Sequence, residues 1–191
     1  GFLPTFSPRA CRSESLQSGK WMKIWLQSGS GLSANGGTPN SRLYEDAVAR
    51  RLEGVARAGT DCVVFGIGST PFGKDRYHAA KHKVFTGLIE SVLRAEPEGY
   101  DAVGVINTFD HRYYELRELL RIPVVFITES TLYLACQLAP TFAVIGHNWQ
   151  TKLQAKELAS HYGLATRMPK GRASTSPMTM SRACVTIRRP I

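Results

Sequence analysis

Short apolar runs along the chain alternate with longer segments in which apolar residues recur every three or four positions. The runs are typical of strands and lie at residues 23–28, 61–65, 101–106, 123–127 and 142–146. The longer segments have the period of amphipathic helices and lie at residues 40–58, 77–95, 113–120, 130–138 and 149–162. Near-continuous apolar strands that alternate with helices indicate a parallel sheet covered on both faces. The predicted fold class is therefore α/β, with a doubly wound parallel sheet and right-handed crossovers.

Turn and cap residues support several of these boundaries. Thr38 and Pro39 suit the start of the first helix, because threonine is a common N-cap and proline fits the first helical turn. Gly163 follows the last helix and suits a C-cap.

Both ends of the chain lack the alternating pattern. Residues 1–21 and 169–191 are rich in Ser, Pro and Arg and have no sustained period. Met22 directly precedes the first strand pattern, so we expect the fold to begin there. Residues 1–21 are interpreted as an unstructured N-terminal extension. Residues 169–191 are interpreted as an atypical basic tail, with a truncated or frame-shifted end, that packs poorly.

The net charge of +9 belongs mainly to these two ends. Residues 1–21 carry +2 and residues 169–191 carry +5, which leaves +2 for the probable fold. This distribution argues against a basic folded face that binds nucleic acid. No apolar stretch reaches the ~18 residues of a membrane span, and the four cysteines have no metal-binding spacing. A reducing cytoplasm is the simplest compartment.

Polar residues gather where the predicted strands end. In an open parallel sheet, ligands bind beyond the carboxyl ends of the strands, next to helix starts that favour anions. The residues at these positions are Gln27, Ser28, Ser69, Thr70, Asn107, Thr108, Asp110, Glu129, Ser130, His147 and Asn148. Asp110, Ser130 and Asn148 taken singly are also explained as N-caps, and Glu129 as an acid stabilised by a helix dipole.

Several common ligand motifs are not supported. Gly29, Gly31 and Ala34 spell GxGxxA, but the predicted helix opens too late and the second strand has no acid at its end. No P-loop and no GxSxG motif occur. His78 and His82 are four residues apart, but HAAKH lacks the glutamate of HExxH, so a solvated basic face is favoured over a metal site.

The third to fifth strands carry a recognisable order of pieces. The segment GYDAVGVINTFDHRYYELRELLRIPVVFITESTLYLACQLAPTFAVIG, residues 99–146, resembles the aspartate/glutamate/hydantoin racemase superfamily. The similar pieces are the glycine–aspartate entry to the third strand, Asp110 after it, and Arg117 and Glu118 before the fourth strand. MKIWLQS at residues 22–28 is similar to the first strand of the hydantoin-racemase-like branch.

This resemblance implies an enzyme without cofactors or metals, in which two α/β domains enclose a small carboxylate or hydantoin. One cysteine from each domain would exchange the α-proton on opposite sides of the substrate carbon. The register places Asn107 at the position of the first cysteine, with Thr108 next to it, and Cys184 lies in no strand-tip context. We therefore expect a racemase-like domain at residues 22–140 and an incomplete second domain that starts at residues 141–168.

Three interpretations remain open. The first is a racemase or epimerase that acts on an amino acid, hydantoin or similar small carboxylate, with Asn107, Thr108 and His147 at the reacting carbon. The substrate would be held by Gln27, Ser28, Ser69, Thr70, Glu129, Ser130 and Asn148. The second is a non-catalytic protein that binds the same ligands. The third is a lyase or decarboxylase that uses Glu129 or His147 as proton carrier. An incomplete domain would also expose apolar surface and favour homo-oligomers.

Overall fold

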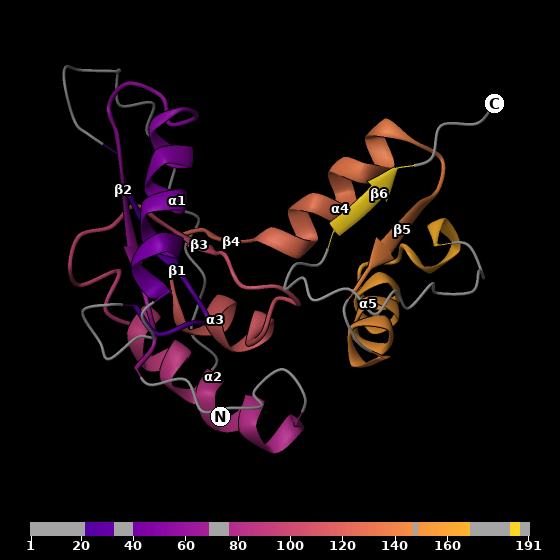
Figure 1. Cartoon of the computed structure of the whole chain (residues 1–191). Coiled ribbons are helices and arrows are strands. Elements are labelled where there is room, and N and C mark those ends of the chain that lie inside the picture. Colours follow the sequence, from indigo (N-terminus) through magenta and orange to yellow (C-terminus); the bar gives the residue numbers. More distant parts are fainter. Residues whose placement is uncertain (1–21, 33–39, 69–76, 147–148, 169–183, 188–191) are drawn as a thin grey trace, which may run out of the picture.

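A computed structural model of the chain describes residues 22–32, 40–68, 77–146, 149–168 and 184–187. Five strand–helix pairs follow one another, and then a short 3-10 helix and a last strand (Figure 1). The strands are β1 (Met22–Gln27), β2 (Thr60–Phe65), β3 (Ala102–Val105), β4 (Val124–Phe126), β5 (Phe142–Ile145) and β6 (Cys184–Ile187). The helices are α1 (Ser41–Glu53), α2 (His78–Val92), α3 (Tyr113–Leu119), α4 (Ile127–Leu138), α5 (Trp149–His161) and η2 (Ala165–Arg167).

The first four strands form one parallel sheet in the order β2-β1-β3-β4. β2 therefore lies on one side of β1, and β3 and then β4 lie on its other side. Right-handed crossovers then place α1 on one face of the sheet and α2 and α3 on the other. The predicted α/β fold with a doubly wound parallel sheet is confirmed.

The main core lies between this sheet and helices α2 and α3. Trp25, Val105 and Phe126 point to it from the strands and are fully buried. Leu88 of α2 and Leu116 of α3 meet them from the helices. This packing explains the alternation in β3, where Val103 and Val105 are buried and Ala102 and Gly104 are less so.

Helix α1 differs from its prediction in burial rather than in position. Its apolar spacing predicts that Leu43 packs inward, but the side chain is 68% exposed. Ser41 is the only residue of this helix that is buried. The apolar spacing of α1 therefore predicts the helix correctly, but it does not predict which of its residues are buried.

Strand β5 lies in a second sheet. The apolar run alone predicts that it continues the parallel sheet, whereas the structure pairs it antiparallel with β6, and Val144 lies opposite Val185. β6 lies inside residues 169–191, for which a poorly packed tail is predicted, and it contains Cys184. An apolar run does not specify its partner strand, and CVTI is too short to show a strand period.

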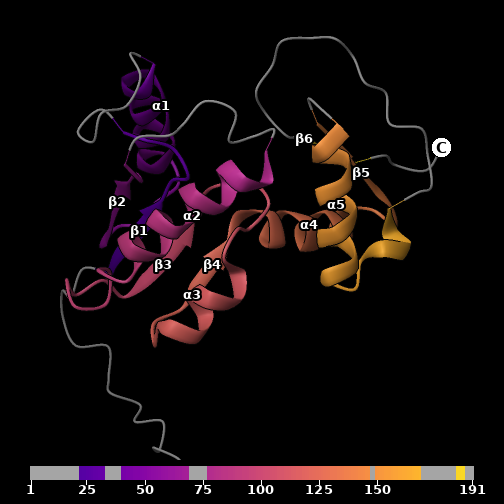
Figure 2. The ribbon, with the colours of Figure 1, turned by 90° about the horizontal axis from the view of Figure 1, so that it is seen from below.

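A second core belongs to this part of the chain. α4 leads from the end of β4 toward β5, β6 and α5, which lie together in Figures 1 and 2. Leu132 of α4, Phe142 of β5 and Tyr162 after α5 are buried there. Tyr113 of α3 packs against both cores and so connects them. Gly163 has φ of +71°, as its predicted C-cap role requires.

Candidate functional site

The carboxyl end of β1 is built around the buried amide of Gln27. Its Oε1 accepts a hydrogen bond from Trp25 Nε1 at 2.9 Å, and its Nε2 donates to the carbonyl of Ser28 at 2.9 Å. The same Nε2 donates to the carbonyl of Phe65 at 3.3 Å, which connects β1 with β2. Ser28 Oγ accepts from the backbone N–H of Ser30 at 3.2 Å. These two predicted ligand residues therefore hold the turn after β1 in place.

Asn107 follows β3 and lies directly against this turn. A Cβ on Gly29 would lie 2.8 Å from Cβ of Asn107, so only glycine fits opposite the asparagine. Oδ1 of Asn107 is buried and has no hydrogen-bond partner among the described residues. A buried acceptor without a partner is uncommon in native structures and suits a ligand N–H. Thr108, the next residue, is exposed.

The loop after Asn107 has an unusual backbone. Phe109, Asp110 and Arg112 have φ of 75°, 46° and 66°, a region that side chains other than glycine rarely adopt. The backbone N–H of Phe109 donates to Oγ1 of Thr128 at 2.9 Å, which ties the loop to the start of α4. Strained backbone persists where the surrounding structure holds it, and it is frequent at functional sites.

The carboxylate of Asp110 connects this loop to α4 and to Tyr162 through three hydrogen bonds. Its carboxylate accepts hydrogen bonds from the backbone N–H groups of Thr128 at 3.0 Å and Glu129 at 2.6 Å. It also accepts one from the hydroxyl of Tyr162 at 2.7 Å. Asp110 thus caps the N-terminus of α4. The sequence predicts that it caps α3, the helix that comes directly after it, but the N-cap of α3 is Arg112.

Burial has the largest effect on the pKa of the Asp110 carboxyl. Asp110 is 3% exposed, and burial raises the pKa of its carboxyl. The hydrogen bonds from Tyr162, Thr128 and Glu129 oppose this rise in pKa without cancelling it. Burial, followed by the hydrogen bond to Asp110, raises the pKa of Tyr162, so its hydroxyl stays protonated and donates.

Glu129 lies in the first turn of α4 and is occupied by an ion pair. Its Oε2 lies 2.7 Å from Nη2 of Arg117, and its Oε1 accepts from the hydroxyl of Tyr113 at 2.9 Å. Nη1 of Arg117 also donates to the Tyr113 hydroxyl. Ser130 is exposed in the same turn, because α4 begins three residues earlier than predicted. The structural interpretation of Glu129 is therefore the better supported one.

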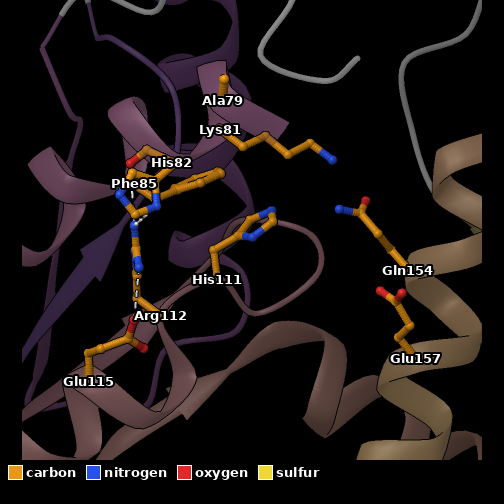
Figure 3. A pocket seen from close by; sticks show the side chains of 9 residues that line it. All are labelled: Ala79, Lys81, His82, Phe85, His111, Arg112, Glu115, Gln154 and Glu157. Carbon is orange, nitrogen blue, oxygen red and sulfur yellow. Dashed lines mark hydrogen bonds and ion pairs between the residues drawn. The ribbon is translucent and has the colours of Figure 1, made fainter. Parts of the chain in front are cut away.

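A cavity of about 580 Å³ opens between the first half of α2, the β3–α3 loop and α5 (Figure 3). One side is lined by Lys81, His82, Phe85, His111, Arg112 and Glu115. Gln154 and Glu157 of α5 line the other side. α2 and α3 follow β2 and β3 of the parallel sheet, and their first turns line the cavity, so this side of it lies at the sheet edge where a ligand is expected.

The cationic side of the cavity is ordered by its own contacts. Arg112 pairs with Glu115 at 2.9 Å, and its Nη2 lies 3.2 Å from Nδ1 of His82. The ring of His111 stacks on Phe85 with centroids 3.9 Å apart. Lys81 is only 8% exposed, although HAAKH indicates a solvated basic face, so that interpretation is wrong for this residue.

The structure does not gather all the predicted site residues. Gln27, Ser28 and Asn107 lie together at the ends of β1 and β3, whereas Glu129 and Ser130 lie at the start of α4. None of the described ones lines the cavity. Ser69, Thr70, His147 and Asn148 fall outside the described residues. The sequence signal for the cavity was weak, namely a pair of histidines four residues apart and a third histidine in a loop.

The described parts of the chain have two further properties that bear on its chemistry and location. They contain no group of three or more His, Cys, Asp or Glu side chains that could hold a metal ion. No helix within them has both the length and the apolar character that a bilayer-spanning segment needs.

Solved structures support the fold. An allantoin racemase from Klebsiella pneumoniae superposes with a TM-score of 0.64 at 19% identity, over 77% of this chain and 56% of that one. An allantoin racemase from Pseudomonas fluorescens gives a TM-score of 0.62 at 21% identity, over 77% and 58%. At these identities the likeness concerns the fold alone.

Sequence comparison identifies the family. A hydantoin racemase from Pseudomonas sp. (strain NS671) is 30% identical over 141 residues, which cover 73% of this chain and 55% of that protein. The chain thus spans about half the length of the relatives it matches. A family model described as Asp/Glu/Hydantoin racemase matches residues 38–183, from before α1 to the residue before β6. The chain therefore belongs to the Asp/Glu/hydantoin racemase family.

Proposed function

We propose that this chain binds a small carboxylate or a hydantoin-like ring compound and exchanges the proton on its α-carbon without a cofactor. The observation that carries the proposal is the family match over residues 38–183, which includes the ends of β2, β3 and β4. The 30% identity to a hydantoin racemase favours a ring or acyl compound with an acidic C–H next to a carbonyl group. Such a proton needs a base and an electrostatic stabiliser, but no redox group.

The proposed binding surface starts at the end of β3. Asn107 occupies the position where the family resemblance expects a cysteine, and its amide does not titrate. Its unpartnered Oδ1 suits a ring or amide N–H of the ligand. Thr108 is exposed beside it and would contact the same ligand.

The remaining predicted residues keep subordinate roles in this proposal. Gln27 and Ser28 would shape the floor of the site through their backbone turn. Ser69, Thr70 and Asn148 would contact the ligand from neighbouring strand ends, and His147 would carry a proton. Glu129 and Ser130 would set the start of α4 rather than bind ligand directly.

The alternative is a non-catalytic protein that holds the same small carboxylates. The absence of cysteine at positions 107 and 108 favours it, since neither an amide nor an unactivated threonine hydroxyl is a base. A lyase or decarboxylase that uses Glu129 is less well supported, because Arg117 and Tyr113 already occupy that carboxylate.

We further propose that the protein works in the cytoplasm and that two copies associate through α4. Ile127, Leu134 and Leu138 lie on one face of this helix and are 45%, 53% and 59% exposed. A second copy of the chain would cover this face.

The test is loss of the α-proton signal in D2O, followed by proton NMR with aspartate, glutamate and a 5-substituted hydantoin. The proposal predicts exchange of at least one of these compounds by the unmodified chain. The matched variant Asn107→Cys returns a thiol to the expected position, and its exchange should be faster. If neither protein exchanges any of the compounds, but saturation-transfer NMR shows that they bind, the non-catalytic alternative is correct.

A further inference from the structure

We infer that the site at the ends of β1 and β3 selects neutral ligands that donate an N–H group, such as a ring amide, and that Asn107 is the residue that selects them. This selectivity rests on the proposed function and narrows its ligand class, because free carboxylates such as aspartate and glutamate are then poor ligands. A specificity-determining residue of this kind binds the ligand without taking part in proton transfer.

Asn107 lies where the strand order of the parallel sheet reverses. β2 lies on one side of β1 and β3 on the other, so the crevice between the ends of β1 and β3 is the switch point at which ligands of open parallel sheets bind. Gly29 follows β1 and Asn107 follows β3. A Cβ on Gly29 would lie 2.8 Å from Cβ of Asn107, so the two residues meet at this crevice.

The amide of Asn107 has an acceptor that the described residues do not use. Its Oδ1 is buried and has no hydrogen-bond partner among them. The residue as a whole is only half-buried, and the terminal torsion of asparagine has a broad range of rotation. A turn of the amide therefore brings Oδ1 to a ligand. Because a buried acceptor without a partner is costly, a ligand N–H that bonds to Oδ1 also removes this cost.

Backbone N–H groups beside this crevice are used within the protein. The N–H of Ser28 donates to the carbonyl of Phe65 at 2.7 Å, and that of Ile106 to the carbonyl of Gln27 at 2.9 Å. The N–H of Ser30 donates to Oγ of Ser28 at 3.2 Å. A carboxylate ligand needs such donors, or a cation, in place of its hydration shell. These three N–H groups are already engaged.

The start of α4, where an anion would also be favoured, holds a carboxylate of the chain itself. The oxygens of Asp110 accept from the backbone N–H groups of Thr128 and Glu129. The N–H of Phe109, in the loop that leads there, donates to Oγ1 of Thr128. The guanidinium of Arg117, beside the same helix start, is paired with Glu129 at 2.7 Å. These donors are therefore engaged as well.

The chemistry of the described groups thus favours a ligand that donates over a ligand that accepts. A hydantoin is neutral at neutral pH and has ring N–H groups next to its carbonyl groups, so it donates to Oδ1 of Asn107 without bringing a charge into the crevice. An amino-acid carboxylate brings a charge that must lose its hydration shell. Its ammonium group can donate to Oδ1, but that hydrogen bond does not compensate the carboxylate.

The first test compares ligands on the unmodified full chain. Titration calorimetry measures the dissociation constants of a 5-substituted hydantoin, of the same compound with methyl groups on both ring nitrogens, and of glutamate. The hydantoin should bind at least about 5-fold more tightly than either, which is the effect of about one hydrogen bond. A smaller preference over either compound would overturn the selectivity and leave the proposed function standing. No binding of any of the three would contradict both.

The second test compares Asn107→Leu with the matched control Asn40→Leu. Leucine has nearly the shape of asparagine but no acceptor, and Asn40 is the exposed N-cap of α1, whose side chain makes no capping hydrogen bond. The preference for the hydantoin over its dimethyl derivative should disappear in Asn107→Leu and persist in the control. Asn107→Ala also lacks the acceptor and gives the same comparison if the leucine variant does not fold.

The readout is a ratio of two affinities on one protein, so a general loosening of the fold does not produce the expected loss. An unchanged ratio in Asn107→Leu would show that another group accepts the ligand N–H and would overturn the role of Asn107. Neither test depends on proton exchange. A chain that binds selectively but exchanges no proton would therefore contradict the catalytic part of the proposed function and support the selectivity.

Discussion

Asp110 joins three parts of the molecule through one carboxylate. It belongs to the loop after β3, its oxygens cap the N-terminus of α4, and Tyr162 after α5 donates to it. The two backbone N–H groups go to different oxygens, Thr128 to Oδ1 and Glu129 to Oδ2. An asparagine at this place would therefore point its NH2 group at one of these donors.

The first prediction concerns this residue and its pH dependence. Asp110→Asn should lower the free energy of unfolding by about 1–3 kcal/mol, because a buried donor loses its acceptor. The exposed Asp46→Asn serves as control. The pKa of Asp110 is raised in the folded state, so the folded protein binds the proton more tightly than the unfolded chain, and ionisation lowers stability as pH rises from about 4.

Urea denaturation over a series of pH values checks the sign. The destabilisation by Asp110→Asn should be largest at acidic pH and should shrink as pH rises through the folded pKa of Asp110. A destabilisation that grows toward neutral pH would mean that the hydrogen bonds lower this pKa more than burial raises it.

The second prediction concerns the contact between Gly29 and Asn107. Gly29→Ala places a methyl group 2.8 Å from Cβ of Asn107, closer than packed carbons lie, so the end of β3 must move. The variant should lose about 1–3 kcal/mol of stability. Gly68→Ala is the matched control, since nothing lies within 4 Å of its added Cβ. Similar melting temperatures for the two variants would show that the contact is not tight.

At the level of elements, α3 and α4 are joined by the cluster of Arg117, Tyr113 and Glu129. Arg117 also donates to the carbonyl of Val124 at 3.1 Å, so it reaches the edge strand β4. Its guanidinium lies over the ring of Tyr113, 4.1 Å from the centroid. The cluster therefore fixes where α4 leaves the sheet.

The third prediction follows from this arrangement. Glu129→Gln should lower the free energy of unfolding by about 1–2 kcal/mol, because the partly buried Arg117 loses its anionic partner. Glu118→Gln, at an exposed position of α3, should change it by less than about 0.5 kcal/mol. Chemical denaturation measures both. Equal effects would show that the ion pair contributes nothing beyond a surface charge.

The predicted elements and the observed ones agree where a segment has a sustained period of its own. All five helices and the first five strands lie within a few residues of their predicted bounds. The sequence pattern predicts less well which segments pair or pack with one another. β5 carries the same apolar signal as β4, but it pairs with β6, and Leu43 has helical spacing without a buried partner.

For the candidate site too, the sequence predicts local positions but not which distant segments come together. The position of ligands in open parallel sheets directs attention to the strand ends, where Asn107 lies against Gly29, and the predicted ligand role of these residues stays a prediction. The cavity could not be predicted in this way, because its lining, which includes Lys81 and His111, depends on how α2, a loop and α5 meet in space. A local sequence pattern does not specify such a tertiary arrangement.

The whole molecule has two cores joined by few side chains. Tyr113 contacts both cores, and the Asp110–Tyr162 hydrogen bond spans the same junction. The apolar face of α4 continues from this junction and is open to solvent. A face of this kind favours association.

The fourth prediction is that the chain self-associates through this face. Sedimentation velocity should show a concentration-dependent dimer for the unmodified chain and a monomer for the double variant Leu134→Glu, Leu138→Glu. Leu43→Glu changes a leucine of α1 that is more exposed than these two and should leave the dimer intact. A monomer at every concentration tested would contradict the prediction.

The central claim is that this family member moves the α-proton of a small carbon acid at the carboxyl edge of its parallel sheet. The most direct measurement is deuterium incorporation at the α-carbon of a 5-substituted hydantoin by the unmodified chain, followed by proton NMR. We expect a loss of the α-proton signal at a rate that is proportional to protein concentration and is higher in Asn107→Cys. An unchanged signal with both folded proteins, for the hydantoin and equally for aspartate and glutamate, would contradict it.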